Sequence, residues 1–413
     1  MTAPILAAAT FCIATTAIQF ASIAVAVVRL RRGAARQSPP SPNLPPVSLV
    51  RPLCGIDNYA ADTLTSTFAL DYPHYEILFC VACANDPVVP FVEALMRRHP
   101  QPGARLLIGD ERVNNNPKLN NVLKGWRAAR HDWIVIADSN VLMPRDYLAC
   151  LFGSWRADTG LVASPPIGCR PQGLWAELEC AFLNTYQARW QYIADAFGFG
   201  FAQGKTMLWG RADLERAGGI EALANEVAED AASTKIVRDA GLRVRLIDRP
   251  LRQPLGHRGA VEVWERQVRW ARLRRASFFA WFLPEALAGG ALPLIVLACI
   301  APALGLPPLA SVIALAALWY GSECLLAAAA GWHLSPLSPL YGLLRDCLLP
   351  VLFVSALRGD DFVWRGNEMQ VERLRPHAMM ALKRPMRPRL EKLAPRARAR
   401  LRSLRARMSA PTG

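Results

Sequence analysis

Acidic residues stand at two places along the chain where their type and position could support chemistry. Asp86 follows an apolar, β-rich run, and Asp138 closes another run in the triplet Asp138-Ser139-Asn140. Oxygen ligands of this kind bind hard cations such as Mg²⁺ or Mn²⁺, which share their remaining positions with substrate phosphates. A cation held there would neutralise the charge of a departing diphosphate, the leaving group of a nucleotide-sugar. Taken alone, each acid is also typical of a solvated turn after a strand.

A third acidic group, Glu229-Asp230, begins a helical stretch that extends to Ala240. The helix dipole favours an acid at that position, which is the purely structural interpretation. The functional interpretation is a general base that removes the proton from an acceptor hydroxyl as the oxygen attacks a sugar carbon. One carboxylate suffices for such an inverting transfer when a metal ion takes the charge of the diphosphate.

Two arginines, Arg266 and Arg269, lie one turn apart in a basic helical run over residues 261–275 that also contains Trp264 and Trp270. Two guanidinium groups that point the same way can clamp a pyrophosphate. A basic amphipathic helix with tryptophans is also typical of a segment that lies on an anionic membrane surface. Both can hold at once, which would join a donor site to the bilayer from which a lipid acceptor arrives.

The elements that must position these residues form an α/β pattern. Short β-rich runs occupy residues 47–50, 75–81, 105–108, 133–137, 161–164 and 243–247, and helical stretches separate them. This alternation predicts one domain over residues 47–277, with a mostly parallel sheet and helices on both faces. Ligands of such sheets collect at the carboxyl ends of the strands, where Asp86 and Asp138 stand.

An apolar segment precedes this domain. Residues 5–28 carry no charge and are long enough to cross a hydrocarbon core of about 30 Å as a helix. Because the first basic residue, Arg29, follows the apolar run, an uncleaved anchor over residues 1–28 is favoured over a signal peptide. Arginines after the anchor place the next part of the chain in the cytoplasm by the positive-inside rule. Residues 29–46 are predicted to be a basic, proline-rich linker.

A second membrane region is predicted over residues 278–357. Its apolar segments are residues 286–306, 309–332 and 340–357, and the first two are expected to form a hairpin across Pro307-Pro308. The third carries Arg345 and Asp346 in its first turns and Pro350 halfway, so we interpret it as re-entrant, interfacial or a third span. The sequence therefore predicts a multi-pass membrane protein.

The net charge of +15 comes from 48 Lys and Arg against 33 Asp and Glu. Residues 383–413 alone hold eleven basic residues and one acid, so ten of the fifteen net charges lie in a short tail. The remaining five are spread too thinly for a nucleic-acid groove, and no nucleic-acid partner is expected. With 52% hydrophobic residues in the chain, the basic segment predicted over residues 358–413 belongs on the cytoplasmic face against anionic lipid headgroups.

Seven short stretches occur in one order over residues 47–275. They are Val47-Ser48-Leu49-Val50-Arg51-Pro52-Leu53-Cys54-Gly55, Leu70-Asp71-Tyr72-Pro73, Asp86-Pro87, Asn116-Pro117-Lys118-Leu119-Asn120-Asn121, Asp138-Ser139, Ala228-Glu229-Asp230 and Arg266-Gln267-Val268-Arg269-Trp270. In this order they resemble the ceramide glucosyltransferases, membrane-bound inverting enzymes with a GT-A fold. The last stretch fits the (Q/R)xxRW signature of that family, Trp364-Arg365 extends the resemblance, and the bacterial members are the most similar.

This resemblance implies a GT-A type nucleotide-sugar-binding domain that transfers glucose from UDP-glucose to the primary hydroxyl of ceramide and inverts the sugar carbon to give β-glucosylceramide. It implies Asp230 as the proton acceptor, Asp86 at the uridine end of the donor, and Asp138 at the divalent cation and the diphosphate. The other donor-binding residues that it implies are Arg51, Lys118, Arg266, Arg269 and Trp270.

Three further residues are candidates for contacts at this site. Asn140 stands where the common Asp-x-Asp motif has its second acid, so it would be a neutral oxygen ligand of the cation. Lys205, in Gln203-Gly204-Lys205-Thr206, departs from the animal pattern and would contact donor, acceptor or solvent. His257, shortly before the arginine helix, is a further candidate metal ligand, although a lone histidine is more often not one.

Three functions remain open. The first is a ceramide glucosyltransferase. The second is a membrane glycosyltransferase that uses another UDP-sugar, such as glucuronate, galactose or GlcNAc, or another lipid, such as a hopanoid or diacylglycerol. The third is a non-enzymatic membrane scaffold whose acids and basic helix are solvated surface. A composition rich in Ala and Arg indicates a bacterial genome, and hence an inner membrane with the catalytic domain facing the cytoplasm.

Overall fold

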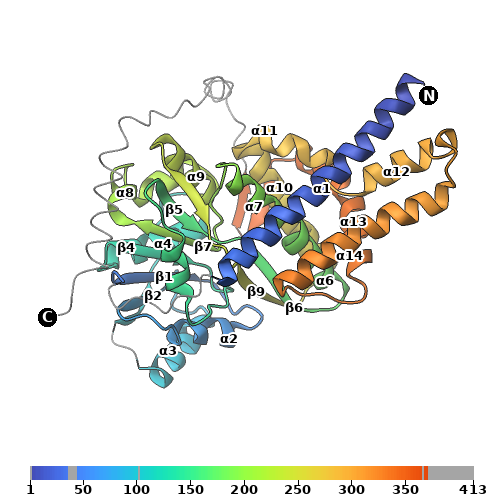
Figure 1. Cartoon of the computed structure of the whole chain (residues 1–413). Coiled ribbons are helices and arrows are strands. Elements are labelled where there is room, and N and C mark those ends of the chain that lie inside the picture. Colours follow the sequence, from blue (N-terminus) through green and yellow to red (C-terminus); the bar gives the residue numbers. More distant parts are fainter. Residues whose placement is uncertain (1, 36–43, 101–102, 365–366, 371–413) are drawn as a thin grey trace. The chain divides into compact units, whose positions relative to one another are not determined.

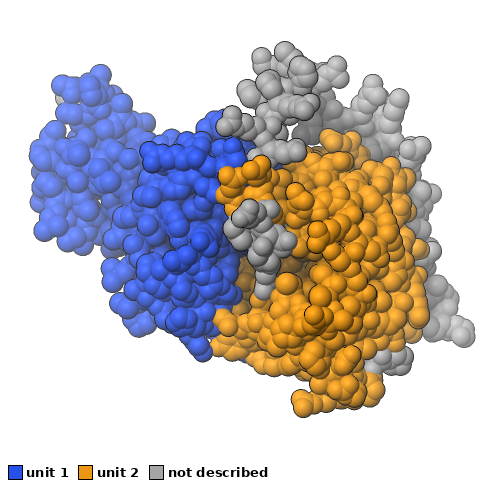
Figure 2. Space-filling model, turned by 180° about the vertical axis from the view of Figure 1, so that it is seen from behind, with its two compact units in different colours: residues 1–32, 167–193, 255–360 blue, residues 33–166, 194–254, 361–413 orange. Residues whose placement is uncertain are grey.

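The computed structural model describes residues 2–35, 44–100, 103–364 and 367–370. Residues 371–413, which hold the charged part of the predicted tail, and residues 36–43 of the predicted linker lie outside the described residues. Contacts group the chain into two compact units of non-consecutive segments (Figure 2). We call residues 1–32, 167–193 and 255–360 the helical unit, and residues 33–166, 194–254 and 361–413 the sheet unit. The consecutive domain boundaries expected from the sequence stay predictions.

The sheet unit contains a seven-stranded sheet in the order β3-β2-β1-β4-β7-β5-β8. Figure 1 labels the strands β1, β2, β4, β5 and β7 of this sheet. The strands are β1 (Val47–Leu53), β2 (Tyr75–Val81), β3 (Ala104–Ile108), β4 (Trp133–Ala137), β5 (Thr159–Ala163), β7 (Thr206–Gly210) and β8 (Arg243–Leu246). All neighbours are parallel except at β7, which is antiparallel to both β4 and β5. The predicted mostly parallel α/β fold is therefore confirmed, and each of the six predicted strands is present within three residues of its expected ends.

Helices cover both faces of this sheet because its central strands are apolar on both sides. The helices of the sheet unit are α2 (Ala60–Thr65), α3 (Val88–Arg98), α4 (Pro117–Ala128), α5 (Tyr147–Gly153), α8 (Arg211–Glu215) and α9 (Glu229–Asp239), with 3₁₀ turns η1 (Ser66–Phe68) and η3 (Ile220–Asn225). Phe79 of β2 and Val92 of α3 belong to one buried cluster. Val135 of β4 and Leu151 of α5 belong to another. Burial of these side chains holds the strands in place, and the carboxyl ends of the strands in turn position the polar residues predicted to act.

Strand β7 is the element of the main sheet that the sequence did not predict. Only its three central residues, Met207, Leu208 and Trp209, form an apolar run, and so short a run does not distinguish a strand from a buried helix. In the structure Ala137 pairs with Thr206, so the next residues, Asp138 and Lys205, face each other beyond the ladder. The Asp138 N–H donates to the Lys205 carbonyl at 3.1 Å. The unpredicted strand therefore brings Lys205 to the predicted cation residue.

The helical unit contains the apolar helices. Its helices are α1 (Ala3–Ala35, which ends in the sheet unit), α6 (Leu174–Ala181), the π-helix η2 (Phe182–Ala188), α7 (Arg189–Ala196, which also ends in the sheet unit), α10 (Ala260–Ser277), α11 (Phe279–Phe282), η4 (Leu283–Leu287), α12 (Ala291–Ile300), η5 (Pro302–Leu304), α13 (Pro308–Ala330) and α14 (Ser338–Leu357). Three helical stretches, at Ala3–Gly33, Pro308–Ala330 and Ser338–Leu357, are long and apolar enough to cross a membrane. These candidate spans support the prediction of a membrane protein.

Two smaller sheets complete the described residues. Strands β6 (Pro166–Gln172) and β9 (Leu251–His257) form one pair, and β10 (Asp361–Trp364) and β11 (Asn367–Gln370) form another. Val268 and Ala271 of α10 are buried in the same cluster as Leu349 and Leu352 of α14. The arginine helix thus packs with an apolar helix of the helical unit.

The first of the three apolar segments predicted in the membrane region is broken in the structure. Residues Phe279–Leu287 and Ala291–Ile300 form a pair bent by 42°, which is either one broken span or a re-entrant loop. Gly289 lies in that break with a φ of +94°, a conformation that residues with a Cβ rarely adopt. The third segment, for which a re-entrant, interfacial or spanning course was open, forms the continuous helix α14, which is long and apolar enough to span; its course in the membrane stays a prediction.

The charges of α14 are paired inside the helical unit. Arg345 contacts Glu323 of α13 at 3.0 and 3.1 Å and lies 2.7 Å from the neighbouring Asp346. Thr185 also donates to Glu323 at 2.8 Å. Charged side chains in apolar helices need such partners. The two charges that argued against a spanning helix therefore have partners within the protein.

Candidate functional site

The loop after β1 connects the two predicted acid positions at the carboxyl edge of the sheet. The Gly55 N–H donates to both carboxylate oxygens of Asp86, at 2.9 and 3.1 Å, and Gly55 has a φ of +67°. The Val88 N–H donates to Asp86 at 2.9 Å. From the other side, Ser139 Oγ donates to Asp57 at 2.6 Å. Strand ends β1, β2 and β4 thus bring Asp86 and the Asp138 segment to one edge, as the sequence predicted.

Asp138 lies between two lysines. Its Oδ1 is 2.7 Å from Lys118 Nζ, and its Oδ2 is 3.0 Å from Lys205 Nζ. Lys205 Nζ also donates to Asn140 Oδ1 at 3.1 Å. The three charged side chains are at most one-fifth exposed, so solvent screens their attraction only in part. Both residues predicted to bind the cation, Asp138 and Asn140, are therefore in contact with ammonium groups.

Lys118 connects Asp138 to the acidic pair at the start of α9. Its Nζ is 2.6 Å from Glu229 Oε1, and it also donates to the Gly204 carbonyl. The Asn116 side chain caps α4 by accepting hydrogen bonds from the N–H groups of Lys118 and Leu119, and its amide donates to Glu229 Oε2 at 2.8 Å. The helix cap therefore fixes both the lysine and the carboxylate that it contacts.

Asp230, the predicted catalytic base, accepts hydrogen bonds from two main-chain N–H groups. The Gly204 N–H donates to its Oδ2 at 3.0 Å, and the Ala231 N–H donates to its Oδ1 at 2.8 Å. Burial and the neighbouring Glu229 carboxylate raise the pKa of Asp230 to about 6, although Lys118 and the two N–H groups act in the opposite direction. A carboxylate with this pKa is ionised at neutral pH and basic enough to accept a proton.

The pKa of Asp138 is shifted in the opposite direction to that of Asp230. Burial by itself would raise the pKa of Asp138, but Lys118 and Lys205 together hold it well below its usual range. Burial would lower the pKa of Lys118, but Asp138 and Glu229 raise it above its ordinary value. Asp138 and Lys118 are therefore both charged at neutral pH. Two neighbouring carboxyl groups thus have pKa values that are pushed apart, which is typical of sites that assign them different tasks.

Gly204 allows the close approach of these groups. A Cβ on Gly204 would lie 2.8 Å from both Lys118 Nζ and Glu229 Oε1, closer than such atoms pack. Sequence reasoning did not single out Gly204 or Asn116 as functional residues. The signal that could have identified them is their position close to Lys205 and Lys118, in the stretches Gln203-Gly204-Lys205-Thr206 and Asn116-Pro117-Lys118.

Arg51, predicted to bind the donor, is completely buried in the sheet unit. Its guanidinium donates to the carbonyls of Asp138 and Ser139, each at 2.8 Å, and to the carbonyl of Thr63 at 2.8 Å. Burial lowers its pKa to about 10, so it stays charged at neutral pH. Arg51 thus holds the turn that carries Asp138, and direct donor binding by Arg51 stays a prediction.

The other predicted donor-binding residues belong to α10 of the helical unit. Arg266 forms ion pairs with Glu179, which is buried, and with Glu262 at 2.8 Å. Although burial lowers the pKa of Arg266, the Glu179 carboxylate raises it overall. Trp270 packs against a buried cluster that includes Cys180. The roles of Arg266, Arg269 and Trp270 at the diphosphate or the acceptor stay predictions.

The arrangement of the sheet-unit residues does not fit the predicted Mg²⁺ or Mn²⁺. Both carboxylate oxygens of Asp138 and the side-chain oxygen of Asn140 already contact ammonium groups. In the described part of the chain, no three His, Cys, Asp or Glu side chains come close enough to hold a metal ion, and His257 is exposed at the end of β9. A divalent cation bound to Asp138 or Asn140 would have to displace at least one of these ammonium groups.

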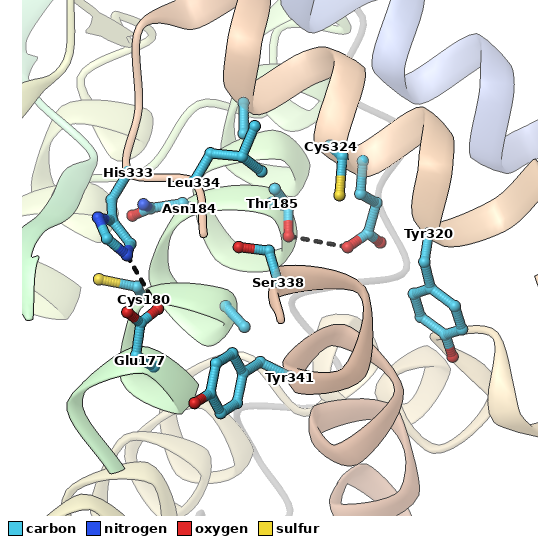
Figure 3. A pocket seen from close by; sticks show the side chains of 13 residues that line it. Glu177, Cys180, Asn184, Thr185, Tyr320, Cys324, His333, Leu334, Ser338 and Tyr341 are labelled. Atoms are coloured by element: carbon cyan, nitrogen blue, oxygen red, sulfur yellow. Dashed lines mark hydrogen bonds and ion pairs between the residues drawn. The ribbon is translucent and has the colours of Figure 1, made fainter. Parts of the chain in front are cut away.

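The helical unit contains a small cavity of about 30 Å³ (Figure 3). His333 Nε2 and Glu177 lie 2.9 Å apart at its wall, and Ser335 Oγ donates to the same carboxylate oxygen at 3.4 Å. A cavity of this size has room for about two water molecules. None of the predicted site residues is among those that line it.

The fold agrees with the comparison to known proteins. The chain combines a mixed α/β sheet, which carries acids at its carboxyl edge, with candidate membrane helices. Residues 14–375 match the family model described as glycosyl transferase family 21, and the chain therefore belongs to this family. The resemblance carried by the seven stretches is confirmed, as are the α/β fold with its mostly parallel sheet and the class of glycosyltransferase.

Two curated relatives are ceramide glucosyltransferases of Caenorhabditis elegans. Ceramide glucosyltransferase 1 is 29% identical over 239 residues, which are 57% of this chain and 51% of that protein. Ceramide glucosyltransferase 3 is 27% identical over 333 residues, 79% of this chain and 72% of that protein. The chain thus matches about half the length of the first relative.

A solved structure, the mannosyltransferase PcManGT from Pyrobaculum calidifontis in complex with GDP-Man and Mn²⁺, is 20% identical. The match covers 84% of this chain and 97% of the mannosyltransferase chain, with a TM-score of 0.44. Similarity of this size identifies neither the donor nor a cation for this chain.

Proposed function

We propose that this chain is an inverting glycosyltransferase that transfers glucose from UDP-glucose to the primary hydroxyl of ceramide and releases β-glucosylceramide and UDP. The observation that carries the proposal is Asp230, whose pKa of about 6 suits a general base and whose carboxylate is held by the Gly204 N–H, next to Lys205 at the carboxyl edge of the sheet. Family membership and the ceramide glucosyltransferase relatives support the choice of a sugar donor and a lipid acceptor.

In the proposed reaction Asp230 accepts the proton of the acceptor hydroxyl while the hydroxyl oxygen attacks the anomeric carbon. The bond from that carbon to the oxygen of the β-phosphate breaks, and the electron pair leaves with UDP. One displacement at the anomeric carbon inverts its configuration, so an α-linked donor gives a β-linked product. The main-chain N–H groups of Gly204 and Ala231 orient the Asp230 carboxylate for this step.

The donor is proposed to bind along the carboxyl edge of the sheet. Asp86, which Gly55 and Val88 hold in place, would contact the uridine end. Lys118 would contact the phosphates, and Arg266, Arg269 and Trp270 of α10 would contribute at the diphosphate and the acceptor. The sequence predicted Mg²⁺ or Mn²⁺ at Asp138, but ammonium groups contact the same oxygens, so the proposed steps use no cation.

The membrane setting supports a lipid acceptor. Three candidate spans would hold the enzyme in the bilayer in which ceramide is dissolved. We propose a bacterial inner membrane, with the sheet unit in the cytoplasm, where UDP-sugars are made. Anionic lipid headgroups are the proposed partners of the basic tail.

The test offers several UDP-sugars to the purified full-length enzyme with ceramide, a hopanoid and diacylglycerol, and identifies the products by mass spectrometry. We expect hexosylated ceramide from UDP-glucose, and a rate with D230N that is lower by about a thousandfold or more, within the usual contribution of a general base. The control variant is D71N, an exposed acid paired with Arg145, which should keep the wild-type rate. Unmodified ceramide beside another glycosylated lipid would reject the proposed acceptor, and a D230N enzyme at the wild-type rate would reject the proposed base.

A further inference from the structure

The proposed reaction needs positive charge where the diphosphate departs, and the structure supplies it with two lysines. Lys118 comes from the N-terminus of α4, and Lys205 comes from the residue before β7. Their ammonium groups contact opposite oxygens of the Asp138 carboxylate, at 2.7 and 3.0 Å. Asp138 thus holds two positive charges at the carboxyl edge of the sheet, where ligands of this fold collect.

Contacts of its side chain and of its main chain hold Lys205 in place. Its Nζ contacts Asp138 Oδ2 and Asn140 Oδ1, and its main-chain carbonyl accepts the Asp138 N–H at 3.1 Å. The antiparallel pairing of β4 with β7 sets this register. Its side chain is 17% exposed against 9% for Lys118, so of the two it is the more accessible to a bound molecule.

Asn140 supports the same conclusion from the other side. A second carboxylate at this position would give a divalent cation two charged oxygen ligands, whereas an amide oxygen is neutral. The amide oxygen instead accepts a hydrogen bond from Lys205. Asn140 thus contributes no negative charge to this edge, and Lys205 contributes a positive one.

We infer that Lys118 and Lys205 together take the place of a divalent cation in this enzyme, and that they bind the donor diphosphate and neutralise the UDP that leaves. This inference rests on the proposed function for the identity of the donor. The lysines stay protonated throughout, the proton of the acceptor goes to Asp230, and no metal-bound group takes part. An ammonium donates up to three hydrogen bonds, so a phosphate contact adds to or replaces a carboxylate contact.

The test measures binding of UDP to the purified full-length enzyme by calorimetry, first in EDTA and then with Mn²⁺ or Mg²⁺. For the wild type we expect dissociation constants that agree within about threefold under these conditions, and sugar transfer that persists in EDTA. For K205Q we expect binding in EDTA to weaken about 10- to 100-fold, the usual effect of losing a hydrogen bond to a charged group. K205R keeps the charge and should stay within about tenfold of the wild type.

The same variant gives a second readout. In K205Q the Asp138 Oδ2 and Asn140 Oδ1 oxygens lose their ammonium partner, so Mn²⁺ can approach them. We therefore expect Mn²⁺ to restore part of the UDP affinity of K205Q while leaving the wild type unchanged. The control is K235Q, which removes another lysine of the sheet unit, paired with Glu226 at 2.5 Å, and should behave as the wild type. Circular dichroism checks that each variant is folded.

The outcomes separate the two proposals. Wild-type binding that falls a hundredfold or more in EDTA, or a folded K205Q that binds UDP as the wild type does, overturns the role of the lysines. Cation-independent UDP binding without glucosylation of ceramide supports the lysines and rejects the proposed acceptor. Absence of binding for UDP, GDP and ADP in every condition overturns both.

Discussion

The raised pKa of Asp230 predicts a specific pH dependence of sugar transfer. The general base must be ionised, so the rate falls as the pH falls through its pKa of about 6. About 91% of Asp230 is ionised at pH 7 and about 9% at pH 5, which makes kcat/KM about tenfold lower at pH 5. An aspartate with the ordinary pKa of 3.8 would be about 94% ionised at pH 5 and would lose almost nothing.

A substitution beside the base tests the cause of this shift. Glu229 raises the pKa of Asp230 through its like charge, and Lys118 lowers it. The variant E229Q removes the like charge and one partner of Lys118, and both changes favour the ionised base. The acidic limb of the pH profile should therefore move to lower pH in E229Q. The matched control is E111Q, an exposed glutamate paired with Arg127, whose profile should follow the wild type.

The assay measures kcat/KM for glucose transfer in buffers of constant ionic strength from pH 4.5 to 8, and circular dichroism reports the folded fraction at each pH. A profile that stays flat between pH 5 and 7 while the protein is folded would refute the assignment of Asp230 as the base. A profile that E229Q leaves unchanged would refute the electrostatic cause.

Three further substitutions test the packing of the site and of the helical unit. K118M leaves Asp138 and Glu229 without their shared partner, so we expect a loss of about 3–5 kcal/mol in the free energy of unfolding, measured by denaturant titration, and a strong loss of UDP binding. G204A places a Cβ 2.8 Å from Lys118 Nζ, so we expect about 1–3 kcal/mol of strain and a slower transfer rate; full activity would contradict the close approach. R345M removes the guanidinium that Glu323 and Asp346 share, so two buried carboxylates lose this cation and the melting temperature of the variant in detergent should fall sharply. The control C347A changes an exposed side chain and should melt as the wild type does.

Much of the sheet could be predicted from the sequence because its parallel strands are short apolar runs bounded by turns. Strands 75–81 and 133–137 were predicted with the bounds that the structure has. The acids that follow them were expected at one edge because parallel strands share their carboxyl ends, and the shared contacts of the loop after β1 agree with this. Periodicity and strand direction therefore sufficed for Asp86 and Asp138.

The contacts across the sheet could not be predicted. That Lys205 faces Asp138 depends on the antiparallel register of β7, which the local pattern of its five residues does not define. The pairing of Arg345 with Glu323 likewise depends on the packing of two helices, and without that contact the charges left a re-entrant, an interfacial and a spanning course open. The contacts that the sequence analysis missed are therefore those that depend on pairing between distant parts of the chain, which local propensity does not determine.

The most direct test of the central claim is the configuration of the product. The full-length enzyme is incubated with UDP-glucose and ceramide, and the anomeric proton of the purified glycolipid is examined by NMR spectroscopy, with D230N in parallel. Direct displacement with Asp230 as the base predicts β-glucosylceramide from the wild type and none above background from D230N. An α-linked product, or a β-linked product formed equally well by D230N, would contradict it.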